Sequence, residues 1–143
     1  MSNDYPPMLC TRRRILLLGT AGVASATGGC LSYLRSESVG LSIGSSHPEE
    51  LTIEIRISPE YGGDPLFHEV ITVDGEQVRL ERENVVTGRY GDDFYVVVRK
   101  PSTGETFDTY WSLTCIGNEN VDDRLRILIT EWGDIRIKSS RCK

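Results

Sequence analysis

The sequence has few of the residues on which metal and catalytic sites are built. Its 143 residues include two histidines, His47 and His68, and both methionines lie before residue 10. A blue-copper site would need a His and usually a Met near Cys115, and neither residue type follows that cysteine. No HExxH motif, CxxC pair or GxGxxG loop occurs, and we assign no nucleophile motif. We therefore expect no catalytic, metal-ligating or cofactor-binding residues and no enzymatic activity.

Basic charge is also scarce in this chain. The formal net charge is −5, and beyond residue 30 the chain has 13 Lys and Arg against 20 Asp and Glu, a net of −7. Binding to a phosphate backbone needs a basic surface, so this balance argues against a nucleic-acid partner. It argues equally against electrostatic adsorption to anionic lipid.

The sequence lacks a hydrophobic run long enough to span a membrane. Its most apolar stretch, residues 15–26, contains Gly, Thr and Ser and falls short of the about 20 apolar residues of a spanning helix. Three arginines precede it and small residues follow it. A basic segment, a short apolar segment and a small-residue end are typical of a secretory signal. A permanent, uncleaved anchor is the alternative interpretation.

The start of this segment resembles a twin-arginine export signal. Residues 11–17 read Thr-Arg-Arg-Arg-Ile-Leu-Leu, which has the hydroxyl residue, the two arginines and the apolar residues of that signal in order. The resemblance implies that the export machinery recognises Arg12 and Arg13 and that the domain crosses the membrane already folded.

The end of the segment, Ala-Thr-Gly-Gly-Cys at residues 26–30, resembles a lipobox. The resemblance implies that the thiolate of Cys30 takes a two-chain lipid, which anchors stably where one chain is marginal. Thr27 departs from the aliphatic residue usual there, and Ala24-Ser25-Ala26 fits ordinary cleavage after Ala26 as an alternative. A double-arginine signal, a lipobox and an acidic domain together resemble the surface lipoproteins of halophilic archaea. This implies a lipid-anchored protein on the outer face of the cytoplasmic membrane.

Four cysteines are present, and two of them are left for pairing. Cys10 precedes the arginines and Cys30 is assigned to the lipid, which leaves Cys115 and Cys142. In an oxidising compartment we expect these two to form a disulfide that holds the C-terminal tail. Buried or free thiols are the alternative.

The remaining chain is dominated by short strand patterns. Residues 50–58 alternate apolar and polar side chains with the period of two that is typical of a sheet with one wet face. Asp74-Gly75 and Gly133-Asp134 are turn dipeptides, and the first is expected to close a type I′ hairpin. Strands are expected over residues 39–43, 50–58, 66–73, 76–81, 93–100, 104–115, 124–132 and 134–139.

This pattern predicts an all-β fold, a single antiparallel β-sandwich of the immunoglobulin-like kind with about 7–8 short strands. The predicted organisation is a signal and lipobox over residues 1–30, a tether over 31–38 and the sandwich over 39–143.

One strand offers a candidate binding face. Tyr110 and Trp111 are adjacent, so in a strand they point to opposite faces, one to the core and the other to solvent. Tyr90, Tyr95 and Trp132 either join the exposed ring or lie in the core. We expect a non-enzymatic interaction or envelope module, with a protein partner on an exposed sheet face and the membrane contacted through the lipid. The alternative is an accessory protein that binds a small solute or metal for a membrane partner.

Overall fold

The computed structural model describes residues 35–75, 79–117, 123–140 and 142. The predicted signal, with Arg12, Arg13 and Cys30, lies outside these residues, as do positions 31–34 of the predicted tether. Among the described residues, no helix is long and apolar enough to cross a membrane.

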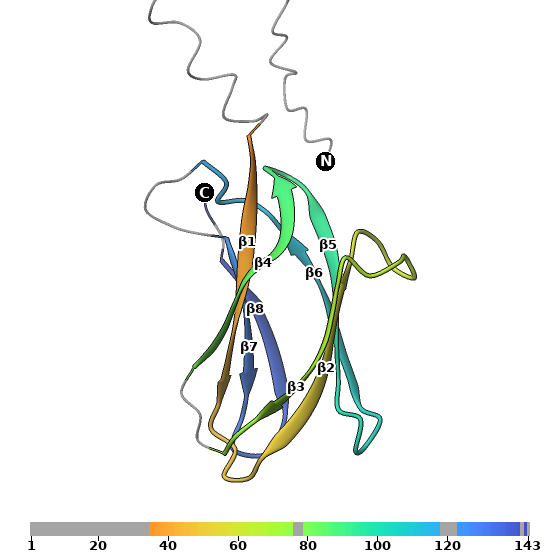
Figure 1. Ribbon diagram of the computed structural model, residues 1–143, viewed down its shortest axis with the longest axis vertical. Coiled ribbons are helices and arrows are strands. Elements are labelled where there is room, and N and C mark those ends of the chain that lie inside the picture. Colours follow the sequence, from red (N-terminus) through yellow and green to blue (C-terminus); the bar gives the residue numbers. More distant parts are fainter. Residues whose placement is uncertain (1–34, 76–78, 118–122, 141, 143) are drawn as a thin grey trace, which may run out of the picture.

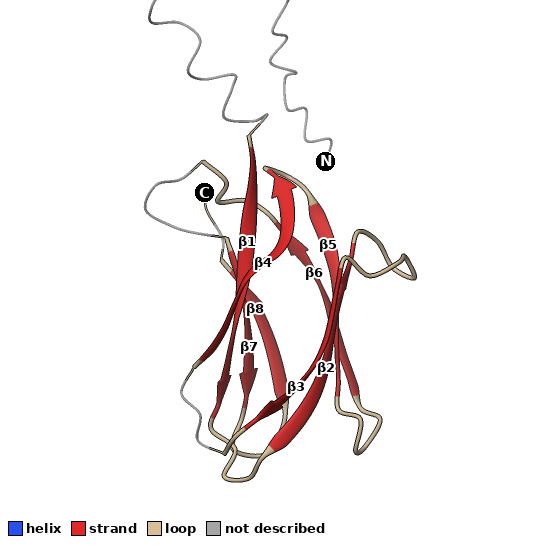
Figure 2. Cartoon of the chain, viewed as in Figure 1, coloured by secondary structure: helices blue, strands red, loops and turns tan. Residues whose placement is uncertain are grey.

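In the described part of the chain, eight strands form two four-stranded sheets that face each other (Figures 1 and 2). No helix occurs in the described ranges, so the all-β prediction is confirmed, and the two-layer arrangement is that of a sandwich. One sheet, here called the β1 sheet, has the strand order β4-β1-β7-β8, and the other, the β2 sheet, has the order β3-β2-β5-β6. The strands are β1 (Ser36–Ser45), β2 (Leu51–Ser58), β3 (Phe67–Val73), β4 (Leu80–Arg89), β5 (Asp93–Arg99), β6 (Thr106–Ser112), β7 (Arg124–Ile129) and β8 (Ile135–Ser139).

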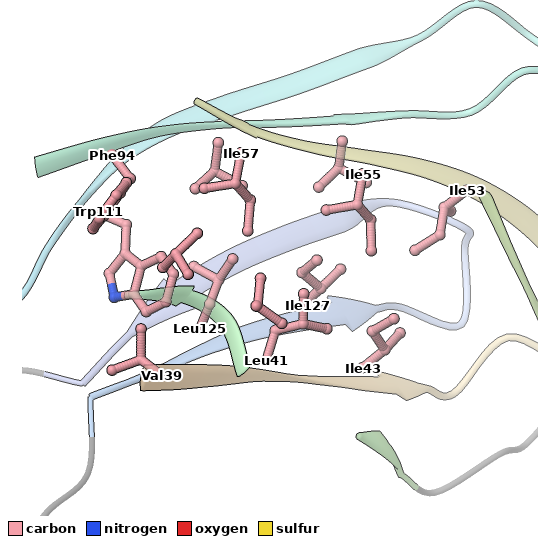
Figure 3. Packing of buried hydrophobic residues seen from close by; sticks show 14 of the residues in the cluster. Val39, Leu41, Ile43, Ile53, Ile55, Ile57, Phe94, Trp111, Leu125 and Ile127 are labelled. Carbon is pink, nitrogen blue, oxygen red and sulfur yellow. The ribbon is translucent and has the colours of Figure 1, made fainter. Parts of the chain in front are cut away.

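The core between the sheets follows from the alternation within the strands. In β2 the odd-numbered residues from Ile53 to Ile57 are fully buried, while Arg56 between them is exposed. Figure 3 shows these isoleucines pointing across the interior toward aliphatic side chains of the β1 sheet. Trp111 is also fully buried and lies beside Phe94, with ring centroids 5.9 Å apart. Full burial of each such side chain contributes about 1.5–3 kcal/mol.

One strand pair departs from the predicted antiparallel arrangement. β1 and β7 pair in parallel, with Leu41 opposite Leu125 and Ile43 opposite Ile127. Parallel neighbours need a long connection, and here the chain between them builds β2 to β6 before it returns. The alternation of apolar and polar residues along a strand is the same whether its neighbour runs parallel or antiparallel. The sequence pattern therefore did not distinguish the two kinds of pairing.

The predicted Asp74-Gly75 hairpin is wrong. β3 and β4 lie in different sheets, because β4 pairs with β1 rather than with β3. Gly75 is not in the positive-φ conformation; instead, an added Cβ would lie 2.3 Å from the Pro48 carbonyl oxygen, so close packing requires the glycine. By contrast, Gly133 has φ 83° and lies between the antiparallel strands β7 and β8, which confirms the second predicted turn.

Strand β4 contains a bulge within its range Leu80–Arg89. Val39 pairs with Val86 but Leu41 pairs with Arg82, so β4 has two extra residues between these positions. Asn84 lies there with φ 55°, a left-handed conformation that Asn tolerates. As a result, the neighbours Val85 and Val86 are both buried, which breaks the alternation that would have marked the strand in the sequence.

The predicted disulfide between Cys115 and Cys142 is present. Their Cα atoms are 5.1 Å apart, and the bond joins the segment after β6 to the tail after β8. The buried carboxylate of Asp123 accepts backbone N–H bonds from Thr114 at 3.2 Å and Cys115 at 2.7 Å. The Cys142 N–H donates to the Thr114 hydroxyl at 3.2 Å, so this corner is held by a covalent bond and by hydrogen bonds.

Replacing both Cys115 and Cys142 with Ala should lower the free energy of unfolding by about 3–4 kcal/mol, because the cross-link closes a loop with a sequence separation of 27. Urea denaturation of the oxidised protein measures this loss. A reducing agent should lower the stability of the unmodified protein to that of the double variant and leave the variant unchanged. Equal stability of the oxidised and reduced unmodified protein would contradict the prediction.

Candidate functional site

The outer face of the β2 sheet brings exposed aromatic side chains together. Strand register places Ser58, Tyr95 and Tyr110 side by side across β2, β5 and β6. Leu66, the residue before β3, lies beside this row, because its N–H donates to the carbonyl of Ile57 in β2. Tyr61, from the loop after β2, packs edge-on against Tyr95. We call the outer surface formed by these five residues the tyrosine face.

The tyrosine face is a packed cluster of rings. The centroids of Tyr61 and Tyr95 are 5.1 Å apart with planes at 72°, and those of Tyr95 and Tyr110 are 5.2 Å apart at 54°. Such tilted contacts are favourable for aromatic pairs. Tyr61 is 75% exposed and Tyr110 61%, whereas the ring of Tyr95 between them is buried. The central ring therefore supports two rings that solvent or a partner can reach.

The hydroxyl of Tyr95 is held by a carboxylate in the next row of the sheet. It donates a hydrogen bond to Oδ2 of Asp108. This bond stabilises the neutral phenol and, together with burial and the charge of the carboxylate, raises the pKa of Tyr95 to about 12.

Strand alternation determines which aromatic residues reach this face. Tyr110 is exposed and its neighbour Trp111 is in the core, which confirms that the pair divides between the two faces. Tyr95 lies on the tyrosine face beside Tyr110, which is one of the two positions that the sequence analysis left open for it. Trp132 lies in the loop between β7 and β8 of the other sheet. Tyr61 was missed by the sequence analysis, because it lies in a loop where no periodicity indicates direction.

A charged cluster lies next to the tyrosine face on the same sheet. At its centre Glu54 accepts a hydrogen bond from Arg56 at 3.1 Å, lies 2.9 Å from His68 Nε2 and pairs with Arg99 at 3.5 Å. The hydrogen bond with His68 lowers the pKa of Glu54, and Arg56 lowers it further against the opposing effect of burial. A shallow hollow of about 210 Å³ is lined by Glu54, Arg56, Arg99 and Val97.

The two histidines lie on different parts of the molecule. His68 is on the sheet surface, as expected, whereas His47 is in the β1–β2 loop, where its Nδ1 is 2.9 Å from the Glu49 carbonyl oxygen. In the described part of the chain, no group of three His, Cys, Asp or Glu side chains is placed to hold a metal ion.

One motif that the sequence analysis passed over needs a correction. Residues 40–44, Gly-Leu-Ser-Ile-Gly, have the letters of the GxSxG motif of serine hydrolases. That motif works at a sharp strand-to-helix turn, but Ser42 lies within β1, paired with Glu81 of β4 and Arg126 of β7. The letters therefore arise from small residues on the outer side of a regular strand.

The described residues thus form an all-β sandwich with a cluster of exposed tyrosines on one sheet. No protein-family model matches the chain, and no curated protein matches it.

Tyr95 should ionise about two pH units later than an ordinary tyrosine, near pH 12 rather than 10. Because the pKa is raised in the folded state, the stabilisation is complete below pH 10 and is lost as the pH rises toward 12. Asp108→Asn should move the late ionisation toward pH 10. Tyrosinate absorbance during a pH titration measures both, with Tyr110→Phe as a control that keeps the late group. Ionisation of all tyrosines together near pH 10 would contradict the assignment.

Proposed function

We propose that this chain is a lipid-anchored extracytoplasmic protein whose β-sandwich acts as a non-enzymatic interaction module at the cell surface. The carrying observation is the tyrosine face, where two exposed rings stand on a buried third ring. Residues 11–30 support export by the twin-arginine machinery and attachment of lipid at Cys30. The disulfide supports an oxidising compartment.

The composition of the tyrosine face and its surroundings favours a protein partner. Tyrosine and arginine are the residue types enriched at the energetic centres of protein interfaces. Here the row of Tyr95 and Tyr110 is followed on the same face of the sheet by the row of Arg56 and then that of Arg99, and both arginines are about half exposed. Val70, on the same face, is 59% exposed. Because Tyr95 holds the two rings in place, little side-chain freedom is lost when a partner covers them.

We further propose that the sandwich is of the immunoglobulin-like kind. The β2 sheet consists of the hairpins β2–β3 and β5–β6, joined through the antiparallel pair β2–β5. This is the arrangement of the C′CFG sheet of variable-type immunoglobulin domains. The parallel pair β1–β7 of the other sheet is a departure from that fold.

Cys30→Ser should transfer the protein from the membrane fraction to the soluble fraction, because the two lipid chains are its proposed anchor. Membrane partitioning after expression in an archaeal host measures the change, and Cys10→Ser is the matched control. The intact mass of the membrane-extracted protein should correspond to a chain that begins at Cys30 and carries a lipid. Unchanged partitioning, or a mature chain that begins elsewhere, would contradict the anchor.

Tyr61→Ala with Tyr110→Ala should abolish partner binding while the fold is retained. A photo-crosslinking residue placed at Thr106, on the same sheet, should give one discrete protein adduct in cells. The double variant should reduce this adduct at least tenfold, as expected for the loss of one or more hot spots of about 2 kcal/mol. Thr87→Ala, on the outer face of the other sheet, is the control and should leave the adduct unchanged. An adduct that survives the loss of both tyrosines would rule out this face.

A further inference from the structure

A groove lies on the outer side of the β1 sheet, over β1, β7 and β8. One part is a hollow of about 390 Å³ over the ends of β1 and β7, and the other is a hollow of about 350 Å³ at the β7–β8 loop. Ser46, Thr130 and Arg136 line both parts, so the two hollows adjoin. The first part is also lined by Gly44 and Leu128. We call this the β7–β8 groove.

The groove forms because β1 offers little side-chain volume to its outer face. Leu41 and Ile43 point into the core, so the outer positions are taken by Gly40, Ser42 and Gly44. Gly40 and Ser42 are themselves covered, whereas Gly44 at the end of this row lines the hollow and leaves room on its β1 side.

Three cations that form no ion pair with the described residues lie along β7 and β8 beside the groove. Arg126 is directly opposite Lys138, and Arg136 is opposite Leu128. All three cationic side chains are exposed, and none forms an ion pair with another residue that the structure describes. Like charges directly opposite on neighbouring strands are destabilising. By contrast, Arg124 at the start of β7 pairs with Glu81 and Glu83 of β4.

This cluster stands out because the exported part of the chain is acidic, with a net charge of −7 beyond residue 30. An anionic ligand would relieve the repulsion between Arg126 and Lys138. Arginine also offers the paired donors that bind a carboxylate or sulfate.

An aromatic ring stands at the far end of the groove. Trp132 is 81% exposed, the largest exposed fraction among the large hydrophobic side chains that the structure describes. Its loop is closed by hydrogen bonds from the Thr130 N–H to the Asp134 carbonyl and from the Gly133 N–H back to Thr130, each 2.9 Å. The buried amine of Lys100 donates to the Gly133 carbonyl at 3.0 Å. The ring is therefore presented to solvent by a braced loop.

We propose that the β7–β8 groove binds an acidic glycan, meaning a polysaccharide with carboxylate or sulfate groups. The apolar face of one sugar ring stacks on Trp132, and its hydroxyls bond to Ser46, Thr130, Glu131 and Asp134 around that ring. The acidic groups of the following sugars bind Arg136, Lys138 and Arg126 along β8 and β7.

The chemistry of the groove separates this ligand from the other polyanions. An anionic membrane would bring its phosphates against Glu131 and Asp134, which flank the tryptophan, whereas the hydroxyls of a sugar can donate hydrogen bonds to these carboxylates. An acidic peptide would satisfy the cations but has no sugar ring for the exposed indole. The groove also lies at the opposite end of β1 from Ser36, about 30 Å along the strand. A chain anchored before Ser36 would present the groove away from the membrane; the glycan site itself does not depend on the anchor.

The purified full chain should bind polygalacturonate and heparin but not neutral dextran, and added salt should weaken the binding. Binding should also protect Trp132 from acrylamide quenching of its fluorescence, since the chain's other tryptophan, Trp111, is fully buried. Arg136→Gln with Lys138→Gln should reduce the affinity at least tenfold. Trp132→Ala should reduce it to a similar degree, and Trp132→Phe should restore part of it.

Two controls are matched to these variants. Arg56→Gln with Arg99→Gln removes the same charge from the charged cluster of the β2 sheet, and Tyr61→Ala removes an exposed ring from the tyrosine face; both should leave glycan binding unchanged. Equal loss in these controls, or equal binding of dextran, would overturn the proposal. So would binding to phosphatidylglycerol vesicles without binding to polygalacturonate, or binding to polyglutamate that is insensitive to Trp132→Ala. Unfolding midpoints check each fold, and if Trp132→Ala fails to fold, Trp132→Phe and the charge variant decide the outcome.

Discussion

The organisation of this protein depends on the burial of alternate aliphatic side chains between two sheets. The isoleucines of β2 meet Leu41, Ile43 and their neighbours in the interior, and no helix of the described residues covers either sheet (Figures 2 and 3). Because every second residue of a strand is used in this way, the residues between them are committed to the two outer faces. The chemistry of each outer face therefore depends on which residues occupy the strand positions that point away from the core.

The two outer faces have become chemically different. On the β2 sheet the remaining positions hold rings and a compensated charge cluster, in which Glu54 is shared by Arg56, His68 and Arg99. On the β1 sheet they hold glycine and serine beside Arg126, Arg136 and Lys138, whose charges are not compensated by described residues. A compensated cluster suits a face that packs against a protein, whereas uncompensated cations suit a charged ligand.

Both faces are supported by groups that restrain their loops. Tyr95 and Asp108 support the exposed rings on one side, and Lys100 braces the loop of Trp132 on the other. At the end of the sandwich opposite the Trp132 loop, the disulfide and the carboxylate of Asp123 hold the segments after β6 and β8. A small all-β domain has a limited hydrophobic core to hold its loops in place. These restraints fix the surface side chains before binding, which reduces the conformational entropy that binding would cost.

The sequence alone determined the cysteine pair, the opposite directions of Tyr110 and Trp111, and every strand except β4, because each of these follows from local alternation or from counting. The strand expected over residues 76–81 overlaps β4 only at its start, and the sequence analysis missed residues 82–89. It did not determine the parallel pairing of β1 with β7, the assignment of β4 to the other sheet, or the bulge at Asn84 that buries both Val85 and Val86. Nor did it bring Tyr61 to Tyr95, or place Ser46 and Trp132 around one hollow, since each of these arrangements joins a loop to another part of the chain. Strand period is a property of neighbouring residues, whereas sheet partners and surface sites depend on which distant segments bury one another's apolar sides, and only the tertiary structure decides that.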